Sequence, residues 1–329
     1  MKVNETKRHI LKALRECVGY LSGETLSSQL GTSRVSIWKH IHSLKEDGYL
    51  IEASPRGYRL ISSPDLLLPY EFPGLEQRIH YFPEIGSTMD AARELAKKGA
   101  GEGTIVIAGA QTHGRGRLSR QWLSPEGGIY FTLILRPGIS PAYAPRINLM
   151  ASVAVAATIR KLFGLKAELK WPNDVLIGGS KVCGILAEID AEMDIVNFVN
   201  IGIGINANNS IPQFEKKMTS LRGTLGREIC RKELLSGLLM EIERWQPLLM
   251  EADLLEEWKK LSVTLNKDVR IVSPDEEIVG RAIDIDTTGA LIVKERNGSL
   301  KKAMAGDCIH LREEAPNTDI RAVSRRHST

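Results

Sequence analysis

Residues 103–135, GTIVIAGAQTHGRGRLSRQWLSPEGGIYFTLIL, place a loop rich in glycine and arginine between two apolar segments. The segments at 103–108 and 128–135 are predicted to be buried strands, because each is a short apolar run next to turn residues. The loop GRGRLSRQW at 114–122 holds three arginines and no acidic residue. Arginine suits carboxylate and phosphate groups, and glycine permits positive φ or close approach to a ligand. A clamp for a small anion and a solvated basic loop both fit, and the position between strands favours the clamp.

Three later blocks combine strand patterns with polar side chains. LKWPNDV at 169–175 sets Lys170, Asn173 and Asp174 around a proline, and it suits either a structural turn or a nucleotide–metal site. GGSKVCGILAE at 178–188 predicts a hairpin turn followed by an apolar strand. Lys181 begins that strand, either extending to water or pointing into a pocket as a fixed positive charge. VNIGIGIN at 199–206 predicts a strand whose glycines permit close approach.

Two helix patterns accompany these blocks. EIGST at 84–88 ends a strand, and Ser87 or Thr88 can cap a helix over 89–98, whose free N–H groups suit an anion or a polar ligand group. The segment 147–159 is apolar on nearly all sides and predicts a buried central helix. Neither GxGxxG nor GxxxxGK[ST] occurs, so an ATP site here is neither a dinucleotide fold nor a P-loop.

The N-terminal residues predict a winged helix-turn-helix. Apolar residues over 4–21, Val18 among them, indicate a first helix, and Gly31 ends a second at 26–30. A third helix over 34–47 is expected to bury Val35, and Tyr49 and Gly57 lie in a following hairpin. The candidate DNA contacts are Ser33, Arg34, Ser36, Lys39, His40 and Arg56. Trp38 suits either packing in the core or an interface, which is favoured, or a base contact. A winged helix used only for protein contact or dimerisation stays open.

Composition and charge narrow the class of protein. Of 329 residues, 43% are hydrophobic and 26% charged, as in ordinary globular chains. Residues 1–62 contain ten Lys or Arg against six Asp or Glu. This surplus of four positive charges equals the net charge of +4 of the whole chain. A basic N-terminal part suggests a polyanionic partner. No apolar run reaches membrane length and no signal-peptide pattern is present, so we expect a cytoplasmic protein. The four widely spaced cysteines are expected to be buried free thiols.

The pattern of elements predicts several domains. A proline-rich stretch at 62–70 separates a winged helix-turn-helix at 1–65 from an alternating α/β domain at 75–262. Four short strands at 268–272, 278–283, 290–294 and 299–304 predict a small SH3-like barrel at 263–313. The polar tail at 314–329 is expected to be disordered.

Three ordered motifs and this domain order together resemble the bacterial family of bifunctional biotin–protein ligases and biotin operon repressors. The motifs are GRGRxxRxW at 114–122, KWPND at 170–174 and KxxGILxE at 181–188. The resemblance implies an α+β fold with a class II synthetase-like centre. It also implies synthesis of biotinyl-5′-AMP from biotin and ATP with Mg²⁺, and transfer of biotin to a lysine of the biotin carboxyl carrier protein of acetyl-CoA carboxylase. Loaded with adenylate, the protein would form a homodimer on operator DNA, so biotin is both substrate and corepressor precursor.

The resemblance also assigns roles to individual residues. Lys181, Arg117 and Arg115 are the catalytic candidates. Biotin contacts are expected from Ser87, Thr88, Met89, Gln111, Arg115, Gly116, Arg117 and Lys181. Nucleotide contacts are expected from Arg120, Trp122, Lys170, Asn173, Asp174 and Asn206, with Asp174 as the Mg²⁺ candidate. Met89, where the family often has Asn, and Leu118 with Ser119, where some members have Arg-Gly, depart from the pattern. A lipoate-type acyl-protein ligase and a non-catalytic ligand-sensing regulator are the alternatives.

Overall fold

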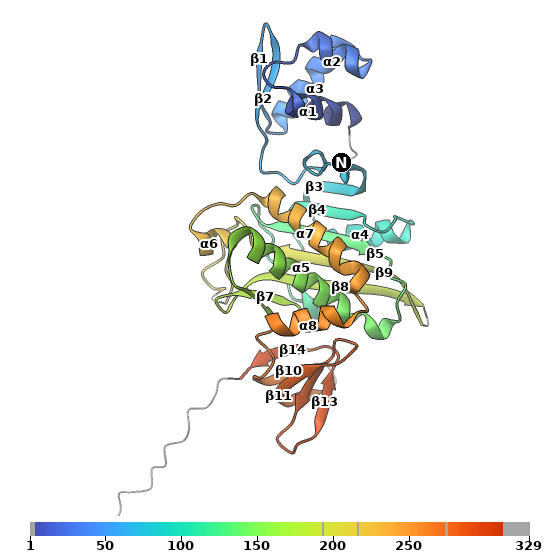
Figure 1. Cartoon of the computed structure of the whole chain (residues 1–329), viewed down its shortest axis with the longest axis vertical. Helices are drawn as coiled ribbons and strands as arrows, with labels where there is room; N and C mark the ends of the chain where they lie inside the picture. Colours follow the sequence, from blue (N-terminus) through green and yellow to red (C-terminus); the bar gives the residue numbers. More distant parts are fainter. Residues whose placement is uncertain (1–3, 193, 216, 274–275, 312–329) are drawn as a thin grey trace, which may run out of the picture.

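A computed structural model describes residues 4–192, 194–215, 217–273 and 276–311 of the chain. Figure 1 shows three parts that follow one another along the long axis, from the N-terminal helices through a central sheet to a C-terminal β domain. The predicted tail at 314–329 lies outside the described residues. Within the described ranges, none of the helices combines the length and the apolar character that a membrane crossing requires.

The N-terminal part is a three-helix unit followed by a hairpin. Its elements are α1 (Glu5–Glu16), α2 (Gly23–Leu30), α3 (Arg34–Glu46), β1 (Leu50–Ser54) and β2 (Gly57–Ser62). Each helix starts at a side-chain cap, as Ser33 shows by accepting a hydrogen bond from the Ser36 N–H at 3.2 Å. Gly31 ends α2 in the left-handed conformation, which gives the turn before the third helix.

Two N-terminal expectations were wrong, and a third was narrowed. The first helix ends at Glu16 and not near Leu21, because Cys17 is extended, and Val18 is fully exposed. Val35 is 64% exposed, because Ile37, Ile41 and Leu44 already fill the inner face of α3. Trp38 is 56% exposed and stacks on His42, with ring centroids 5.5 Å apart, so it does not pack in the core of this domain and the expected packing in an interface stays a prediction.

The central part is a seven-stranded sheet with helices on both faces. The strand order is β3-β4-β5-β9-β8-β7-β6, in which only the β3–β4 pair is parallel. The strands are β3 (Ile79–Ile85), β4 (Ile105–Gln111), β5 (Ile129–Leu135), β6 (Ala167–Lys170), β7 (Asp174–Ile177), β8 (Ser180–Glu192) and β9 (Ile195–Ile205). The helices are α4 (Thr88–Lys97), α5 (Pro145–Phe163), α6 (Leu221–Leu225), α7 (Arg231–Trp245) and α8 (Ala252–Leu261). Short 3₁₀ turns are η1 (Pro69–Glu71), η2 (Glu76–Arg78), η3 (Arg117–Ser119), η4 (Pro141–Tyr143) and η5 (Gln246–Leu248).

The two faces of this sheet bury different cores. Alternate residues of a strand point to opposite faces, so Val106 packs with Ala92 and Ala96 of α4, whereas Ile105 and Ile107 belong to the main core. That main core includes α5, which is buried along most of its length as its sequence predicts, and α7. The face that carries α4 is the more open one, and it holds the cavity described below.

The C-terminal part is a five-stranded antiparallel sheet, ordered β13-β12-β11-β10-β14. Its strands are β10 (Asp268–Val272), β11 (Glu277–Ile285), β12 (Leu291–Lys294), β13 (Leu300–Ala303) and β14 (Asp307–His310). The sequence predicted four of them and missed β14, because DCIH is too short and too mixed to show a clear alternation. β14 pairs with β10 and forms one edge of the sheet, so the sequence missed an edge strand.

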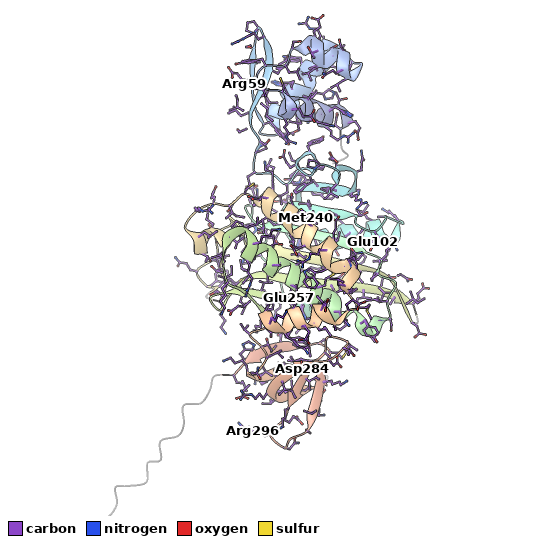
Figure 2. The ribbon with its side chains drawn as sticks, in the orientation of Figure 1. Arg59, Glu102, Met240, Glu257, Asp284 and Arg296 are labelled. Carbon is purple, nitrogen blue, oxygen red and sulfur yellow. The ribbon has the colours of Figure 1, made fainter. Side chains whose placement is uncertain are left out.

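Ion pairs connect the three parts. Glu71, almost fully buried in η1, accepts from Arg15 of α1 at 2.6 Å and from Lys232 of α7 at 3.1 Å. At the C-terminal end of the central part, Lys259 Nζ of α8 lies 2.9 Å from Asp284 Oδ1 of β11. Figure 2 labels Asp284. The mixed α and β fold in three parts agrees with the sequence-based expectation. All four cysteines are free, as expected, but only Cys183 and Cys308 are buried, since Cys230 is exposed and Cys17 half-buried.

Candidate active site

A cavity of about 400 Å³ opens on the α4 face of the central sheet, where the start of α4 and the loop between β4 and β5 meet β8 and β9. Twelve of the fourteen candidate ligand-site residues line it: Thr88, Met89, Gln111, Arg115, Gly116, Arg117, Arg120, Trp122, Lys170, Asn173, Asp174 and Lys181. These residues come from segments up to 93 positions apart in the chain, counting from Thr88 to Lys181. The structure therefore gathers the three sequence motifs around one space.

The arginine loop folds back on itself. The Gly116 N–H donates to the Arg120 carbonyl at 2.8 Å, and the Trp122 N–H donates to the Gly114 carbonyl at 2.8 Å. The expected positive φ is absent from both of these glycines and occurs at Leu118, with φ 53°. Gly114 is required for space, because a Cβ there would lie 2.6 Å from the Ser124 hydroxyl. The loop geometry thus depends on close packing at Gly114 and on a left-handed leucine at its tip.

The three arginines of the loop have different partners. Arg115 lies 3.0 Å from both Asp90 and Glu188. Arg120 forms an ion pair with Asp307 of β14. Arg117 is partly buried, and within the described part of the chain it donates only to neutral acceptors, the Asn173 side chain at 3.3 Å and the Gly306 carbonyl at 3.2 Å. Burial lowers the pKa of the Arg117 guanidinium, because desolvation disfavours the charged form.

The KWPND block and Lys181 form the opposite wall. Lys170 ends β6 and Asp174 begins β7, so the turn between them holds both side chains at one edge of the sheet. Lys181 Nζ lies 2.6 Å from Asp174 Oδ1 and 5.1 Å from the centre of the Trp122 ring. The side-chain amide of Asn173 donates to the Ile185 carbonyl at 2.7 Å, which fixes the turn against β8. Lys181 lines the cavity, so of its two expected placements the structure shows the one in which it points into a pocket.

Glycines of β8 and β9 form a flat floor under Trp122. A Cβ on Gly184 would lie 3.0 Å from Cζ3 of the indole, and a Cβ on Gly204 would collide with its Nε1. The close approach that the sequence predicted for VNIGIGIN is thus made by the Trp122 side chain. The indole Nε1–H is buried and has no hydrogen-bond partner among the described residues. It is a free donor, which a bound ligand can satisfy.

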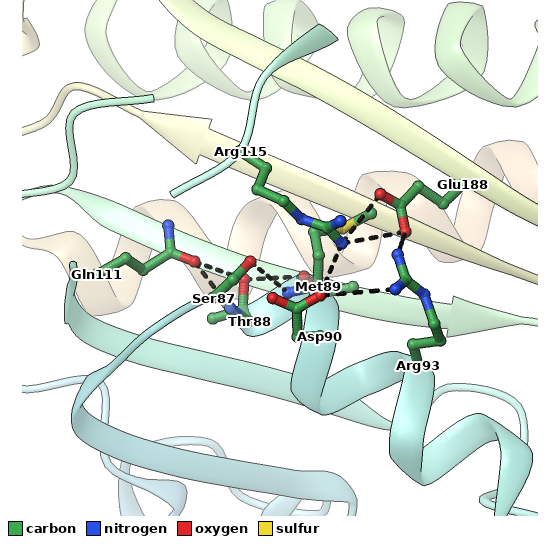
Figure 3. A network of polar contacts seen from close by, with 9 residues as sticks. Ser87, Thr88, Met89, Asp90, Arg93, Gln111, Arg115 and Glu188 are labelled. Carbon is green, nitrogen blue, oxygen red and sulfur yellow. Dashed lines mark hydrogen bonds and ion pairs between the residues drawn. The ribbon is translucent and has the colours of Figure 1, made fainter. Parts of the chain in front are cut away.

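The start of α4 forms the remaining end of the cavity, seen in Figure 3. Ser87 caps the helix by accepting from the Met89 N–H at 3.3 Å, and the Thr88 N–H donates to the Gln111 side chain at 2.8 Å. Ser87 itself does not line the cavity, because its hydroxyl serves the helix. Asn206 also lies away from the lining residues; it is buried and accepts from Asn209 at 3.1 Å.

Several lining residues were not anticipated from the sequence. Asp307 reaches the cavity from the C-terminal sheet, and Glu215, Lys217 and Met218 reach it from the segment after β9. That segment is held beside β8 by a hydrogen bond from the Lys181 N–H to the Lys217 carbonyl at 2.7 Å. Glu188 does not line the cavity but pairs with Arg115 beside it, and it carried a signal as the last residue of the KxxGILxE block. Among the residues that the structure describes, no group of three or more His, Cys, Asp or Glu is arranged to hold a metal ion.

The candidate DNA contacts lie on α3 and the wing. Arg34 and Lys39 are exposed on α3, whereas Ser36 and His40 are partly covered, and burial lowers the pKa of the His40 imidazole. On the wing, the guanidinium of Arg56 lies 5.0 Å from the centre of the Tyr20 ring. Ser33 serves as the cap of α3. Arg34, Lys39 and Arg56 are thus the exposed cations among these candidates. Their domain lies at the opposite end of the molecule from the C-terminal sheet (Figure 1).

Comparison with known proteins links these features to described families. Residues 81–206 match the biotin/lipoate A/B protein ligase family, residues 6–59 match a helix-turn-helix domain, and residues 264–311 match the biotin protein ligase C-terminal domain. The chain is 39% identical to the bifunctional ligase/repressor BirA of Bacillus subtilis, over 88% of this chain and 93% of that protein. It is 32% identical to BirA of Escherichia coli, over 87% and 91%. The biotin protein ligase of Aquifex aeolicus, solved with biotin and ATP, is similar in structure, with a TM-score of 0.62, 28% identity and coverage of 71% of this chain and 99% of that one.

Proposed function

This chain belongs to the family of bifunctional biotin ligase/repressors, and from that premise we propose that it activates biotin with ATP and transfers it to a lysine of a biotin carboxyl carrier protein. A biotin carboxylate oxygen bonds to the α-phosphorus of ATP as the bond to the pyrophosphate oxygen breaks. The neutral amine of the carrier lysine then bonds to the activated carbonyl carbon, AMP leaves, and the amine loses one proton. The products are pyrophosphate, AMP and a biotin amide.

The observation that carries this proposal is the state of Arg117. A partly buried guanidinium with neutral acceptors faces a cavity that Lys170 and Lys181 also line. Adenylation brings a carboxylate and a triphosphate together, so their repulsion must be offset by fixed cations. We assign Arg117 and Lys181 as the cations nearest the reacting carboxylate. There they also stabilise the negative charge that develops on the α-phosphate.

We divide the remaining candidate contacts between the two substrates. The biotin side is assigned to the lining residues Thr88, Met89, Gln111, Gly116, Arg117 and Lys181, with Ser87 and Arg115 supporting that end through the cap of α4 and the arginine loop. The nucleotide side is assigned to the lining residues Arg120, Trp122, Lys170, Asn173 and Asp174, with the buried Asn206 behind them. The free Nε1–H of Trp122 and the flat glycine floor beneath its ring support a stacking surface at the nucleotide end. Met89 offers biotin a thioether in place of the amide that family members often have there.

The donor set is compatible with Mg²⁺ on the nucleotide side. Mg²⁺ in proteins usually takes one or two carboxylates and fills its other positions with phosphate oxygens and water. Asp174 is the carboxylate that would hold it, beside Lys170 and with Asp307 also on the cavity wall. Bound there, the ion would neutralise phosphate charge. Asp174 would then contact both the ion and Lys181, so its ion pair with Lys181 would be weaker.

The N-terminal domain supports a second role in repression. We propose that residues 1–65, 75–262 and 263–313 act as DNA-binding, ligase and C-terminal domains. The adenylate-loaded chain would form a homodimer that binds a palindromic operator of biotin genes, since two-fold DNA sites require a two-fold protein. The exposed Arg34 and Lys39 of α3 and Arg56 of the wing support binding to the phosphate backbone.

The enzymatic proposal is tested by incubating the full chain with ATP, labelled biotin and a carrier domain. Label on the carrier lysine supports it. Transfer of lipoate but not biotin contradicts it in favour of a lipoate-type ligase, and binding without transfer contradicts it in favour of a sensor. The repressor proposal is tested by gel shift on DNA upstream of biotin genes. Retardation that requires biotin together with ATP supports it, and equal retardation without them contradicts the coupling.

A further inference from the structure

We propose that Arg115 is a positioning residue, which fastens the first half of the arginine loop to α4 and β8 through Glu188 and Asp90. This inference rests on the proposed function and refines it. Two arginines two positions apart in the loop would then have separate roles. Arg115 would hold the loop in place, and Arg117 would meet the substrate anion.

Arg115 belongs to a network of four charged side chains (Figure 3), which it joins through Nη2 while its Nε has no hydrogen-bond partner among the described residues. Its Nη2 lies 3.0 Å from Glu188 Oε1 and 3.0 Å from Asp90 Oδ1. Arg93, one turn after Asp90 on α4, pairs with the other oxygen of Glu188 and lies 3.7 Å from Asp90. The hydrogen bond to Glu188 raises the pKa of the Arg93 guanidinium. Two cations and two carboxylates balance, so the positive charge of Arg115 is already neutralised by the protein.

The network joins the three segments that build the biotin end of the cavity. Arg115 stands next to Gly116 and Arg117 of the loop, Asp90 follows Thr88 and Met89 of α4, and Glu188 lies on the strand that starts near Lys181. The Arg115 and Glu188 side chains are only 33% and 26% exposed, which limits screening by solvent. Releasing the network would therefore loosen the loop and the start of α4 together.

The two possible roles of Arg115 predict opposite effects of the same substitution. If Arg115 binds the substrate carboxylate, Glu188 competes for its guanidinium, and Glu188→Gln strengthens biotin binding. If Arg115 positions the loop, Glu188→Gln removes the charge that holds it, and biotin binding weakens. Glutamine keeps the size of the side chain, so packing changes little.

The experiment compares the full-length wild type, Glu188→Gln and Glu192→Gln. Glu192 is an exposed residue at the far end of the same strand and serves as the matched control. We expect Glu188→Gln to raise KM for biotin and the release rate of the adenylate by about tenfold, as loss of a charge-assisted pair does. KM for ATP should change much less. Hydrogen exchange in peptides covering residues 112–123 of the ligand-free chain should become faster, and Glu192→Gln should match the wild type.

A lower KM for biotin in Glu188→Gln, or an unchanged KM with unchanged exchange, overturns the inference. If that variant folds poorly, Asp90→Asn repeats the test, because it removes the second carboxylate from an exposed position on α4. Failure of the wild type to make adenylate would contradict the proposed function, while the exchange measurement would still test the network. An active wild type with an unaffected Glu188→Gln would contradict the network alone.

Discussion

Arg120, in the loop between β4 and β5, forms an ion pair with Asp307 at the start of β14. The two residues are 187 positions apart in the chain. Arg117 donates to the carbonyl of Gly306, the residue before Asp307, at 3.2 Å. The C-terminal sheet therefore holds the second half of the arginine loop and forms part of the cavity wall.

Asp307→Asn is expected to weaken the nucleotide end of the site. Loss of the ion pair frees Arg120, so KM for ATP should rise by roughly 3- to 10-fold, whereas global stability should change by less than about 1 kcal/mol because Arg120 is mostly exposed. Steady-state kinetics at varied ATP and a urea titration measure the two effects. Asp268→Asn, an exposed position on β10 of the same sheet, is the control. An unchanged KM for ATP would show that the contact has no role in the site.

Lys181→Ala is expected to slow adenylate formation by roughly 10²- to 10³-fold, the usual effect of losing one stabilising group for developing charge. The substitution also leaves Asp174 without its partner at 2.6 Å. Pyrophosphate release with biotin and ATP gives the rate, and circular dichroism checks that the DNA-binding fold persists. Lys166→Ala, whose lysine is exposed, should behave as wild type. Wild-type rates in Lys181→Ala would contradict the assigned role.

Gly204→Ala should displace the Trp122 side chain, because the added methyl group would occupy the position of the indole. Overpacking of this kind costs about 1–3 kcal/mol, and we expect weaker ATP binding as well as lower stability. Urea unfolding and isothermal titration with ATP measure both. Gly101→Ala has open space around the new methyl and is the matched control. Full stability with normal ATP affinity would mean that Trp122 is free to move.

His310 should make the stability of the protein depend on pH. Burial lowers its pKa from 6.5 to about 4, and Lys170 and Lys267 add to the effect. The unfolded chain therefore binds the proton more readily, so the stability is complete above about pH 6.5 and decreases as the pH falls toward 4. The loss should be on the order of 1–2 kcal/mol after allowance for solvent.

Thermal melts of wild type and His310→Gln at about pH 7.5 and about pH 5 test this expectation. The variant should lose less stability on acidification, although it also weakens the contact between His310 and the Thr264 hydroxyl at 3.2 Å. His9→Gln, an exposed site on α1, should keep the wild-type response. Equal pH responses in all three proteins would contradict the linkage to His310.

Arg34→Ala should weaken DNA binding without affecting the fold, because Arg34 is exposed at the first position of α3. Loss of one phosphate contact lowers the slope of log affinity against log salt by about 1. Filter binding to DNA upstream of biotin genes, in a salt series with biotin and ATP, measures that slope. Lys161→Ala, on α5 of the central domain, should leave it unchanged. The same slope in Arg34→Ala and wild type would remove Arg34 from the contact set.

The order of elements and most of the chemistry could be read from the amino-acid sequence. Apolar periodicity and turn residues act locally, so the winged helix, the buried α5 and four of the five C-terminal strands could be predicted. The charged motifs could be identified because their residue types suit anions wherever they lie. Val18 and Val35 were misplaced, since periodicity does not say where a helix ends or which apolar residues the core has room for.

Which charged side chains meet depends on the packing of the folded chain. The pairing of Arg115 with Glu188 and Asp90, and of Arg120 with Asp307, depends on how α4, β8 and β14 pack, and no local pattern contains that information. Arg117 donates to neutral acceptors because the same packing pairs the nearby carboxylates of Asp307 and Asp174 with Arg120 and Lys181. Sequence supplied equivalent arginines, and three-dimensional contact made them different.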